Sequence, residues 1–459
     1  ALIGPAGEKL VRYACIINDL KHAAGRTGMG AVMGAKNLKC IAARGRTAIP
    51  IADDAAFKQL AKHMRDTWKE RAWGMHELGT PGGLTGLNER GALPTRNFQD
   101  GQFEGAEKIG GEALRDTILI DRGGCFACPI RCKRVVEVND GDYNVDPTYG
   151  GPEYETIGAF GSNCGVDDLR AIAKANELCN AYGLDTISTG MVISFAIECF
   201  ENGLLTRDDT GGLDLHFGNA QAIVTLTQQI ATREGLGDLL AEGSEYAAAK
   251  IGGGAKAFAI NVKGQPFPMH ECRIRHGQAL GYAVSPTGAD HMHNIWDEGL
   301  AQESLGEGWL CTGVYTPVET TVLNGQKVHA YTVNANQKWL INHLGLCMFI
   351  PWTTDHVVEL VRSITGWETN LWELLQTAER SVNLMRLFNL RAGWTAADDV
   401  LPARMAKPHV SGTLNEKPIT PEVLEKGVHT FYSMMGWDPE TGIPTQAQLE
   451  KLEIAWASS

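Results

Sequence analysis

The chain of 459 residues is long enough for two or three domains with hydrophobic cores, and its composition (44% hydrophobic, 21% charged) is ordinary for a globular protein. A net charge of −13 argues against nucleic acid or an anionic membrane surface as partner, because both would repel it. No apolar run is long enough to span a bilayer, and nothing at the start has the pattern of a signal peptide. The odd number of cysteines, eleven, favours reduced thiols in a cytoplasmic protein over a secreted disulfide framework.

The first third of the chain predicts one clear helix and a loop-rich region. Residues 1–49 are rich in Gly, Ala and basic residues and end in a segment with the character of a strand, 40–43. Apolar residues at helical spacing predict an amphipathic helix from about 53 to 77. Residues 80–152 are expected to form mainly loops, and they carry a cluster of cysteines.

Helical signals dominate the remainder. Asp167 and Asp168 can cap a helix that ends at Gly183, and residues 186–201 are apolar nearly all round, which predicts a buried helix. Irregular structure with short strands is expected over 255–296, and helix again over 328–400. The predicted fold class is therefore mainly α with small β elements, with the chemistry on segments between helices.

The cysteine cluster has the spacing C-x2-C-x3-C. Cys125, Cys128 and Cys132 can hold three corners of one iron–sulfur cubane, because short loops turn the three sulfurs toward a common centre. Zinc is the competing metal, although zinc sites usually combine two separated C-x2-C pairs, and inert buried thiols are a further alternative. A fourth ligand must come from a distant position, and spacing leaves eight cysteines eligible: Cys15, Cys40, Cys164, Cys179, Cys199, Cys272, Cys311 and Cys347.

A glycine-rich segment precedes the first long helix. It lacks the G-K-[ST] end of a Walker loop and does not fit G-x-G-x-x-G after a strand. Gly28 and Gly30 would let backbone amides approach an anion closely, and Arg26 and Lys36 add positive charge. A tight turn between two elements explains the same glycines without any ligand.

Two further groups of polar residues are candidates for chemistry. Glu153 and Glu155 flank a tyrosine after a Gly-Gly-Pro turn, and carboxylates of this kind are more often solvated than catalytic. His291 and His293 could share one face of a strand and bind zinc, but no third ligand is evident in the sequence.

Five segments resemble the aldehyde ferredoxin oxidoreductase family, and they occur in that family's order over essentially the whole chain. They are 24–37, 124–132, 151–156, 182–188 and 344–347, and 383–399 is also similar. The resemblance implies the helical second and third domains of that fold, with a remnant of its β-rich N-terminal domain. We accordingly expect three parts: 1–49, the end of an otherwise missing N-terminal pterin-floor domain; 50–255, with the cysteine cluster and first pterin motif; and 256–459, with the active-site histidine and second pterin motif.

The resemblance also implies a tungsten bis-pterin cofactor of the molybdopterin type, with Mg²⁺ bridging the pterin phosphates. The family's paired pterin motifs, D-x-x-G-L-D and D-x-x-G-L-C, correspond to 180–185 and 342–347, with asparagine in place of the first aspartate in both. An amide still accepts a hydrogen bond from a pterin amine but brings no negative charge. The cofactor-binding residues implied are Arg26, Gly28, Gly30, Ala31, Lys36, Asn180, Leu184, Asp185, His293, Asn342 and Leu346.

By the same resemblance Cys347 is the fourth ligand of a [4Fe-4S] cluster, Glu155 is the general base beside tungsten, and His291 donates a hydrogen bond to the substrate oxygen. The implied reaction is anaerobic oxidation of an aldehyde to a carboxylic acid, with electrons passing through the cluster to ferredoxin or an iron–sulfur electron-transfer subunit. The family also allows for a homo-oligomer.

Two other functions share these motifs. One is a reductive relative resembling the catalytic subunit of tungsten-dependent benzoyl-CoA reductases, in which Cys164 could serve as a metal ligand instead of a packed thiol. The other is a pterin-free iron–sulfur subunit for electron transfer, against which the presence of both Glu155 and His291 speaks.

Overall fold

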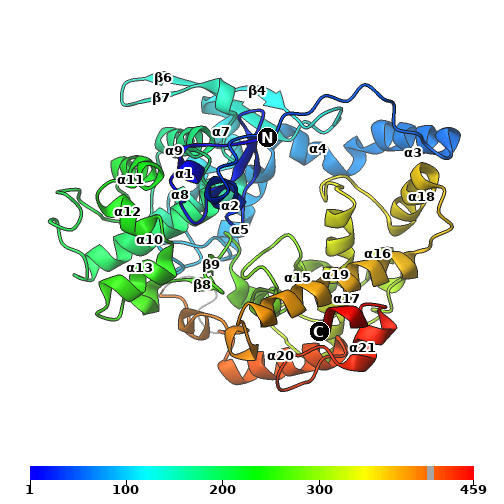
Figure 1. Cartoon of the computed structure of the whole chain (residues 1–459). Coiled ribbons are helices and arrows are strands. Elements are labelled where there is room, and N and C mark those ends of the chain that lie inside the picture. The colour runs from blue at the N-terminus through cyan, green and yellow to red at the C-terminus, as the bar shows by residue number, and fades with distance from the viewer. Residues whose placement is uncertain (411–417, 459) are drawn as a thin grey trace. The chain divides into compact units, whose positions relative to one another are not determined.

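The computed structural model describes residues 1–410 and 418–458, in which helices predominate over short strands (Figure 1). The predicted fold class is confirmed. The chain divides into two compact units: unit 1 comprises 1–44, 74–271 and 402–416, and unit 2 comprises 45–73, 272–401 and 417–459. No helix in the described residues is both long enough and apolar enough to cross a bilayer. The three-part division predicted from the sequence stays a prediction.

Unit 1 contains most of the helices and all the strands of the described residues. Its helices are α1 (Pro5–Glu8), α2 (Met29–Ala35), α5 (Leu84–Glu89), α6 (Ala106–Ile109), α7 (Gly111–Thr117), α8 (Tyr154–Phe160), α9 (Leu169–Tyr182), α10 (Thr186–Glu201), α11 (Ala220–Thr232), α12 (Leu236–Leu240) and α13 (Ser244–Ile251). Its strands are β1 (Leu2–Ile3), β2 (Ile16–Asn18), β3 (His22–Ala24), β4 (Leu119–Gly123), β5 (Lys133–Val136), β6 (Val138–Asp140), β7 (Tyr143–Val145), β8 (Asn261–Val262) and β9 (Gln265–Pro266).

The core of unit 1 forms around α10, which packs against α8 and α11 (Figure 1). Thirteen of its sixteen residues are buried, as the apolar sequence predicts. Asp185 caps its first turn by accepting hydrogen bonds from the backbone N–H groups of Ile187 and Ser188, each at 3.1 Å. The preceding helix, α9, begins at the predicted cap Asp168 and ends at Gly183, whose φ of 76° is left-handed.

The strands form small antiparallel sheets. β1, β2 and β3 form one sheet in that order, and β4–β5, β6–β7 and β8–β9 are two-stranded. The strand predicted at 40–43 is wrong: Cys40 forms only an isolated bridge with Leu2, and the residues that follow are exposed without a ladder. A strand forms only when it pairs with a neighbouring strand, and apolar residues in the sequence do not show whether such a neighbour exists.

The single helix predicted over 53–77 is two helices in the structure, α3 (Asp54–Thr67) and α4 (Lys69–Leu78). Asp53 caps α3, and the boundary between the two units falls within α4. Unit 2 is otherwise built from α14 (His276–Val284), α15 (Asp297–Leu300), α16 (Glu307–Leu310), α17 (Gly325–His343), α18 (Thr354–Thr365), α19 (Leu371–Arg391), α20 (Pro421–Met434) and α21 (Gln446–Lys451). The long helices α17 to α19 confirm the helical prediction for 328–400.

Helix α14 lies in the region predicted to be irregular, 255–296, and is buried along its whole length. Two of its nine residues are glycines, which disfavour helix in isolation, so tertiary packing against α17 and α20 stabilises it.

A fully buried ion pair joins α15 to α17. The Lys327 ammonium contacts the Asp297 carboxylate, and neither side chain is exposed to solvent. Burial raises the pKa of Asp297, and Lys327 together with the backbone N–H groups of Gly277 and Gln278 opposes that rise. Removing one partner of such a pair leaves an uncompensated buried charge.

We therefore predict that Lys327→Met lowers the free energy of unfolding by about 3–5 kcal/mol, as measured by denaturant unfolding. The matched control is Lys451→Met, because Lys451 is exposed and its pair with Glu379 at 3.3 Å is screened by water. The control should lose less than about 1 kcal/mol. Equal losses in the two variants would contradict this account of the buried pair.

Candidate active site and cysteine loop

Glu155 lies in the first turn of α8, where a helix dipole favours a carboxylate. Glu153 precedes the helix, and its carboxylate accepts a hydrogen bond from the Thr80 hydroxyl and pairs with Lys133 at 3.0 Å. The same hydroxyl accepts the backbone N–H of Tyr154 at 2.9 Å. Glu153 is thereby held by Thr80 and Lys133, whereas Glu155 has other partners.

Both oxygens of Glu155 contact Met269 and His270, which lie near the end of the middle segment of unit 1. Oε2 accepts the backbone N–H of Met269 at 2.8 Å, and Oε1 lies 2.9 Å from Nε2 of His270. The side chains of Glu155 and His270 are 16% and 7% exposed, so this carboxylate is far less solvated than carboxylates usually are. The carboxylate is thus held at both oxygens, by the Met269 N–H at Oε2 and by the His270 ring at Oε1.

Tyr154 closes the arrangement. Its ring stacks on that of His270 with centroids 5.2 Å apart, and its hydroxyl donates to the carbonyl of Met269. His270 is therefore fixed on one face by an aromatic ring and at one nitrogen by Glu155. A carboxylate with an oriented imidazole beside it can accept and return a proton.

A cavity of about 150 Å³ lies on the same unit, between β3, β5 and the start of α10. It is lined by Lys21, Ala23, Gly25, Lys133, Arg134, Gly150, Gly151, Glu153, Thr156, Asn176, Asn180, Leu184, Asp185 and Thr186. Three predicted pterin contacts, Asn180, Leu184 and Asp185, are thus brought together. Two amides, several backbone glycines and both signs of charge suit a polar heterocycle with phosphate, so the donor set fits a pterin.

The glycine-rich segment is only partly at this cavity. Arg26 reaches it, since its Nε lies 3.5 Å from Asp185 Oδ2 and a guanidinium N–H donates to the carbonyl of Pro266 at 2.6 Å. Gly30 does not line it: a Cβ at this position would lie 2.5 Å from the carbonyl oxygen of Cys15, so glycine is required for α2 to pack closely. Gly28 is also buried, and Ala31 lies within α2. Lys36 is exposed at the C-terminal end of α2.

The predicted residues of unit 2 lie around two turns. His291 is half-buried in the turn that follows Gly288, and the His293 ring stacks on Trp339 with centroids 3.5 Å apart. Burial lowers the pKa of His293, which Asp290, 3.3 Å from Nδ1, opposes. A largely neutral, stacked imidazole can donate or accept one hydrogen bond to a ligand.

The second pterin motif forms the C-terminal end of α17. Gly345 adopts a left-handed φ of 66°, and the backbone N–H of Leu346 returns to the carbonyl of Ile341 at 3.0 Å, which ends the helix. Asn342 and Cys347 are exposed and Leu346 is half-buried. This Gly-Leu element therefore ends a helix. That it also binds a pterin stays a prediction.

Cys125, Cys128 and Cys132 lie on one loop between β4 and β5, and none is in a disulfide. The backbone N–H of Cys128 returns to the carbonyl of Cys125 at 3.1 Å, and Ala127 and Arg131 adopt left-handed φ of 56° and 51°, so the chain turns sharply between the cysteines. Three accessible thiols on one tight loop form a donor set that fits an iron–sulfur cluster. Cys347 belongs to unit 2, and its ligation stays a prediction.

Other cysteines have a different environment. Cys164 is fully buried, and its thiol donates to the carbonyls of Ala159 and Gly190 at 3.3 and 3.5 Å. Burial raises the pKa of Cys164 well above its ordinary value and that of Cys199 to about 12. Both are therefore held as protonated, packed thiols, which favours the packed-thiol alternative for Cys164.

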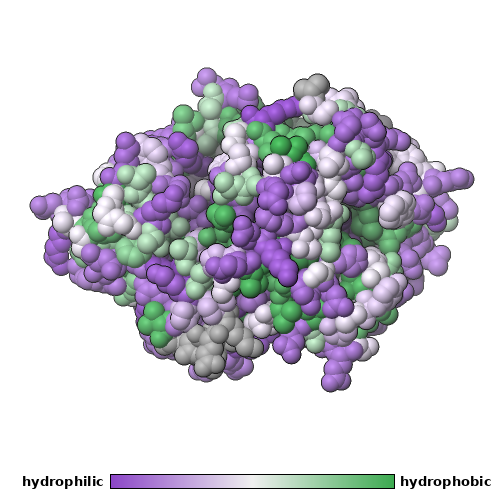
Figure 2. Space-filling view, turned by 90° about the horizontal axis from the view of Figure 1, so that it is seen from below, coloured by the Kyte–Doolittle hydropathy of each residue, from purple (hydrophilic) through white to green (hydrophobic). Residues whose placement is uncertain are grey.

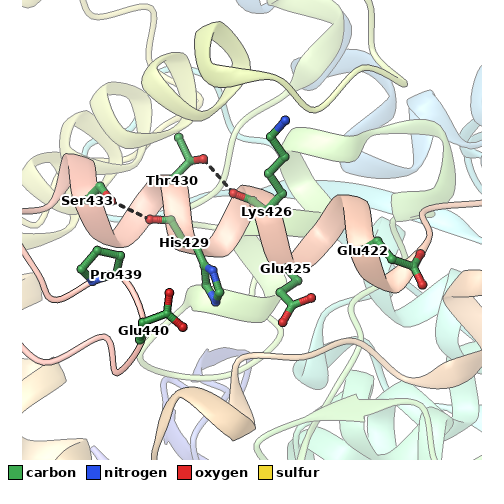
Figure 3. A pocket seen from close by; sticks show the side chains of 8 residues that line it. All are labelled: Glu422, Glu425, Lys426, His429, Thr430, Ser433, Pro439 and Glu440. Carbon is green, nitrogen blue, oxygen red and sulfur yellow. Dashed lines mark hydrogen bonds between the residues drawn. The ribbon is translucent and has the colours of Figure 1, made fainter.

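Other parts of the surface do not gather the predicted residues. An open depression of about 470 Å³ in unit 2 is lined by Glu422, Glu425, Lys426, His429, Thr430, Ser433, Pro439 and Glu440 (Figure 3). The hydroxyls of Thr430 and Ser433 donate to carbonyls of the same helix, so they do not converge on a ligand. On the face drawn in Figure 2, hydrophilic side chains predominate and hydrophobic ones form scattered patches, as is normal for protein surfaces.

Sequence reasoning named His270 only as a substitute base should Glu155 prove dispensable, and it assigned no role to Met269 or Arg134. The one signal for His270 was its place in Met269-His270-Glu271, within a stretch resembling the family's approach to the site. Its partner, Glu155, is more than a hundred residues away in the chain, and spacing does not reveal such a contact.

Two family models match the chain: the description "aldehyde ferredoxin oxidoreductase, domains 2 & 3" over residues 57–454, and "aldehyde ferredoxin oxidoreductase, N-terminal domain" over residues 1–45. The chain belongs to the aldehyde ferredoxin oxidoreductase family. It is accordingly an oxidoreductase, as the resemblance predicted.

Among similar proteins, the tungsten-containing aldehyde ferredoxin oxidoreductase of Thermococcus kodakarensis is 36% identical over 99% of this chain and 73% of its own length. A Pyrococcus furiosus protein described as an aliphatic sulfonate oxidoreductase, WOR-like subunit, is 30% identical over 99% of this chain and 70% of its own. A chain of the benzoyl coenzyme A reductase active-site complex BamBC, with 1,5-dienoyl-CoA, has a TM-score of 0.75 at 21% identity, covering 100% of this chain and 74% of that one. This last likeness concerns the fold.

The thiol environments predict an order of alkylation. In the metal-depleted chain at pH 8, iodoacetamide should modify the exposed Cys125 rapidly and Cys199 only after denaturation, because the buried thiol is protonated and inaccessible. Peptide mass spectrometry measures both rates. Loading with iron and sulfide should protect Cys125, Cys128, Cys132 and Cys347 together. Labelling of Cys199 as fast as Cys125 in the native chain, or iron binding that leaves Cys347 reactive, would contradict these assignments.

Proposed function

We propose that the chain is the catalytic subunit of a tungsten-pterin oxidoreductase that oxidises an aldehyde to a carboxylic acid. The observation that carries the proposal is the Glu155 carboxylate, poorly solvated and held between the Met269 N–H and the His270 ring. Similarity to tungsten-containing aldehyde ferredoxin oxidoreductases over 99% of the chain supports the metal and the substrate class.

The overall chemistry sets what the residues must do. An aldehyde and water yield a carboxylic acid, two protons and two electrons, so the site needs a proton acceptor and an outlet for electrons. When bound, the tungsten-pterin group accepts the electron pair. Asn180, Leu184, Asp185 and Arg26 would hold one pterin and His293, Asn342 and Leu346 the other, and Mg²⁺ would offset the charge of the phosphates.

Glu155 supplies the proton acceptor. Its carboxylate removes a proton from water or from the hydrated aldehyde, and His270 and the Met269 N–H keep its oxygens oriented while it does so. Because the side chain is only 16% exposed, bulk water competes weakly for the same oxygens. His291 donates a hydrogen bond to the substrate oxygen and so polarises the carbonyl.

Electrons leave through the cysteine loop. Cys125, Cys128, Cys132 and Cys347 would hold a [4Fe-4S] cluster, and that group would supply one-electron transfer to ferredoxin or to an iron–sulfur partner subunit. The half-buried to exposed position of the three loop cysteines supports an outlet toward a partner.

Metal analysis combined with substrate assays tests the proposal directly. Tungsten and iron in the purified protein, together with aldehyde-dependent reduction of a viologen dye, are expected. Tungsten with reduction of an aromatic thioester only would identify the reductive alternative. Iron without tungsten would identify an electron-transfer subunit, and either result would overturn aldehyde oxidation.

The role of Glu155 yields a sharper prediction. Glu155→Gln keeps the size of the side chain but removes the proton acceptor, so turnover of aldehyde should fall roughly a hundredfold or more when proton removal limits the rate. Tungsten and iron content should stay at wild-type levels. Steady-state dye reduction and elemental analysis measure both effects.

The matched control is Glu112→Gln, an exposed glutamate in α7, which should keep full turnover. A Glu155→Gln enzyme with normal metal content and normal turnover would remove Glu155 as the base. Loss of tungsten in this variant alone would show instead that Glu155 is structural.

A further inference from the structure

Arg134 is the largest side chain in the core of unit 1, and it lies two residues after the last cysteine of the loop. Arg134 is only 1% exposed to solvent, although arginine is rarely buried without an acidic partner. Its guanidinium donates to four backbone carbonyls instead. No carboxylate among the described residues lies within ion-pair distance of it, so its positive charge is uncompensated by a direct contact.

The four carbonyls belong to two different segments. Two are on the cysteine loop: Cys132 accepts from Nε at 3.2 Å, and Arg131 from a terminal N–H at 3.2 Å. The other two, those of His76 at 3.0 Å and Glu77 at 2.8 Å, belong to the last turn of α4. Carbonyls in a last turn lack partners within their own helix, so one guanidinium satisfies both the helix end and the loop.

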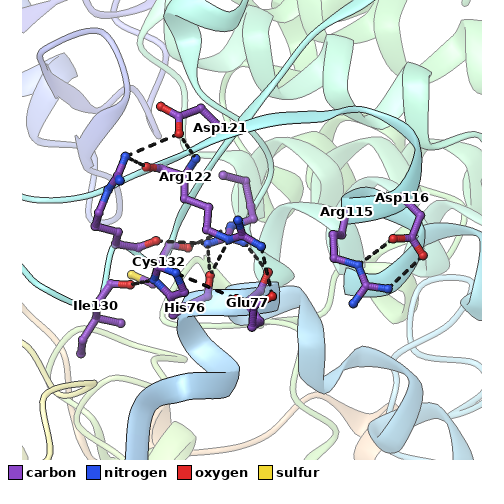
Figure 4. Close-up of polar contacts among 10 residues, drawn as sticks. His76, Glu77, Arg115, Asp116, Asp121, Arg122, Ile130 and Cys132 are labelled. Carbon is purple, nitrogen blue, oxygen red and sulfur yellow. Dashed lines mark hydrogen bonds and ion pairs between the residues drawn. The ribbon is translucent and has the colours of Figure 1, made fainter. Parts of the chain in front are cut away.

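Neighbouring groups strengthen the same junction (Figure 4). Nδ1 of His76 lies 2.7 Å from the carbonyl of Ile130, and Arg122 donates to the carbonyl of His76 at 3.1 Å. Arg122 differs from Arg134 in that its guanidinium pairs with the carboxylate of Glu77, 3.1 Å away. Arg122 thus has a direct ion pair, whereas the carboxylates of Glu153 and Glu77 act on the charge of Arg134 only from beyond contact distance.

Arg134 also lines the cavity that contains Asn180 and Asp185. One buried cation therefore touches both the backbone of the cysteine loop and the wall of the cavity assigned to a pterin. The reduction potential of an iron–sulfur cluster depends on nearby charge, on hydrogen bonding and on exposure to solvent. A fixed positive charge in a medium of low polarity stabilises the reduced, more negative cluster.

We propose that Arg134 is the positioning residue of the cysteine loop and that its buried positive charge raises the reduction potential of the cluster bound there. This inference rests on the proposed [4Fe-4S] cluster and adds to it a residue that sets its potential. The hydrogen bonds from the guanidinium fix the backbone of the cysteine loop. The positive charge raises the reduction potential of the cluster that would accept electrons from the cavity and donate them to the partner.

The test uses the full chain loaded with iron, and it measures iron per chain, the electron paramagnetic resonance spectrum of the reduced cluster and its midpoint potential. Arg134→Gln removes the charge, so the midpoint potential should become more negative. Arg134→Lys keeps the charge but cannot serve four carbonyls at once, so its potential should stay near that of the wild type while iron per chain falls.

The control is Arg115→Gln in α7. Arg115 is exposed, and in Figure 4 its guanidinium contacts only the adjacent Asp116. This variant should match the wild type in iron content, spectrum and potential.

Arg134→Gln with the midpoint potential and iron content of Arg115→Gln would overturn the role of Arg134 and leave the cluster itself intact. If Arg134→Gln cannot be recovered folded, Arg134→Lys decides: unchanged iron content would overturn the positioning role. A wild-type chain that takes up no iron would overturn the cluster and this inference together.

Discussion

The close approach of α8 to the Met269 segment is the contact on which the candidate site depends. Gly158, on α8, allows this approach, because a Cβ there would lie 2.7 Å from Cγ and 2.8 Å from Cβ of Met269. With Met269 pressed against the helix, its N–H reaches Glu155 and its carbonyl accepts the Tyr154 hydroxyl. His270 follows in the chain and is thereby set beside the carboxylate. A side chain at 158 would therefore push Met269 away from α8 and lengthen its hydrogen bond to Glu155.

Two buried charged side chains beside the cavity of unit 1 are satisfied largely by backbone groups. Arg134 is satisfied by carbonyls, and Asp185 by the first N–H groups of α10. Both side chains border the same cavity, so the groups that stabilise the fold also line the space proposed for the cofactor. Buried polar groups that are fully hydrogen-bonded hold a single arrangement, which electron transfer and proton transfer both require. This coupling explains why a change at Arg134 should affect both loop geometry and potential.

Local signals in the sequence predicted much of the fold. The caps at Asp168 and Gly183 and the apolar run of 186–201 gave helices whose bounds the structure confirms, because capping and periodicity act over a few residues. Helix α14 escaped prediction, since its glycines disfavour helix until neighbouring helices enclose it. The cysteine loop was evident from spacing, whereas His270 as partner of Glu155 depends on contacts between distant segments. The family resemblance supplied the rest of the candidate site.

Anomalous diffraction from crystals of the metal-loaded enzyme, recorded at the iron and tungsten absorption edges, tests the central claim most directly. The account predicts iron bound by Cys125, Cys128, Cys132 and Cys347, and a tungsten site whose nearest protein groups include Glu155 and His291. Arg134 should lie between the iron and the pterin nearest to it. Tungsten remote from Glu155, or iron held by the loop cysteines without Cys347, would contradict the account.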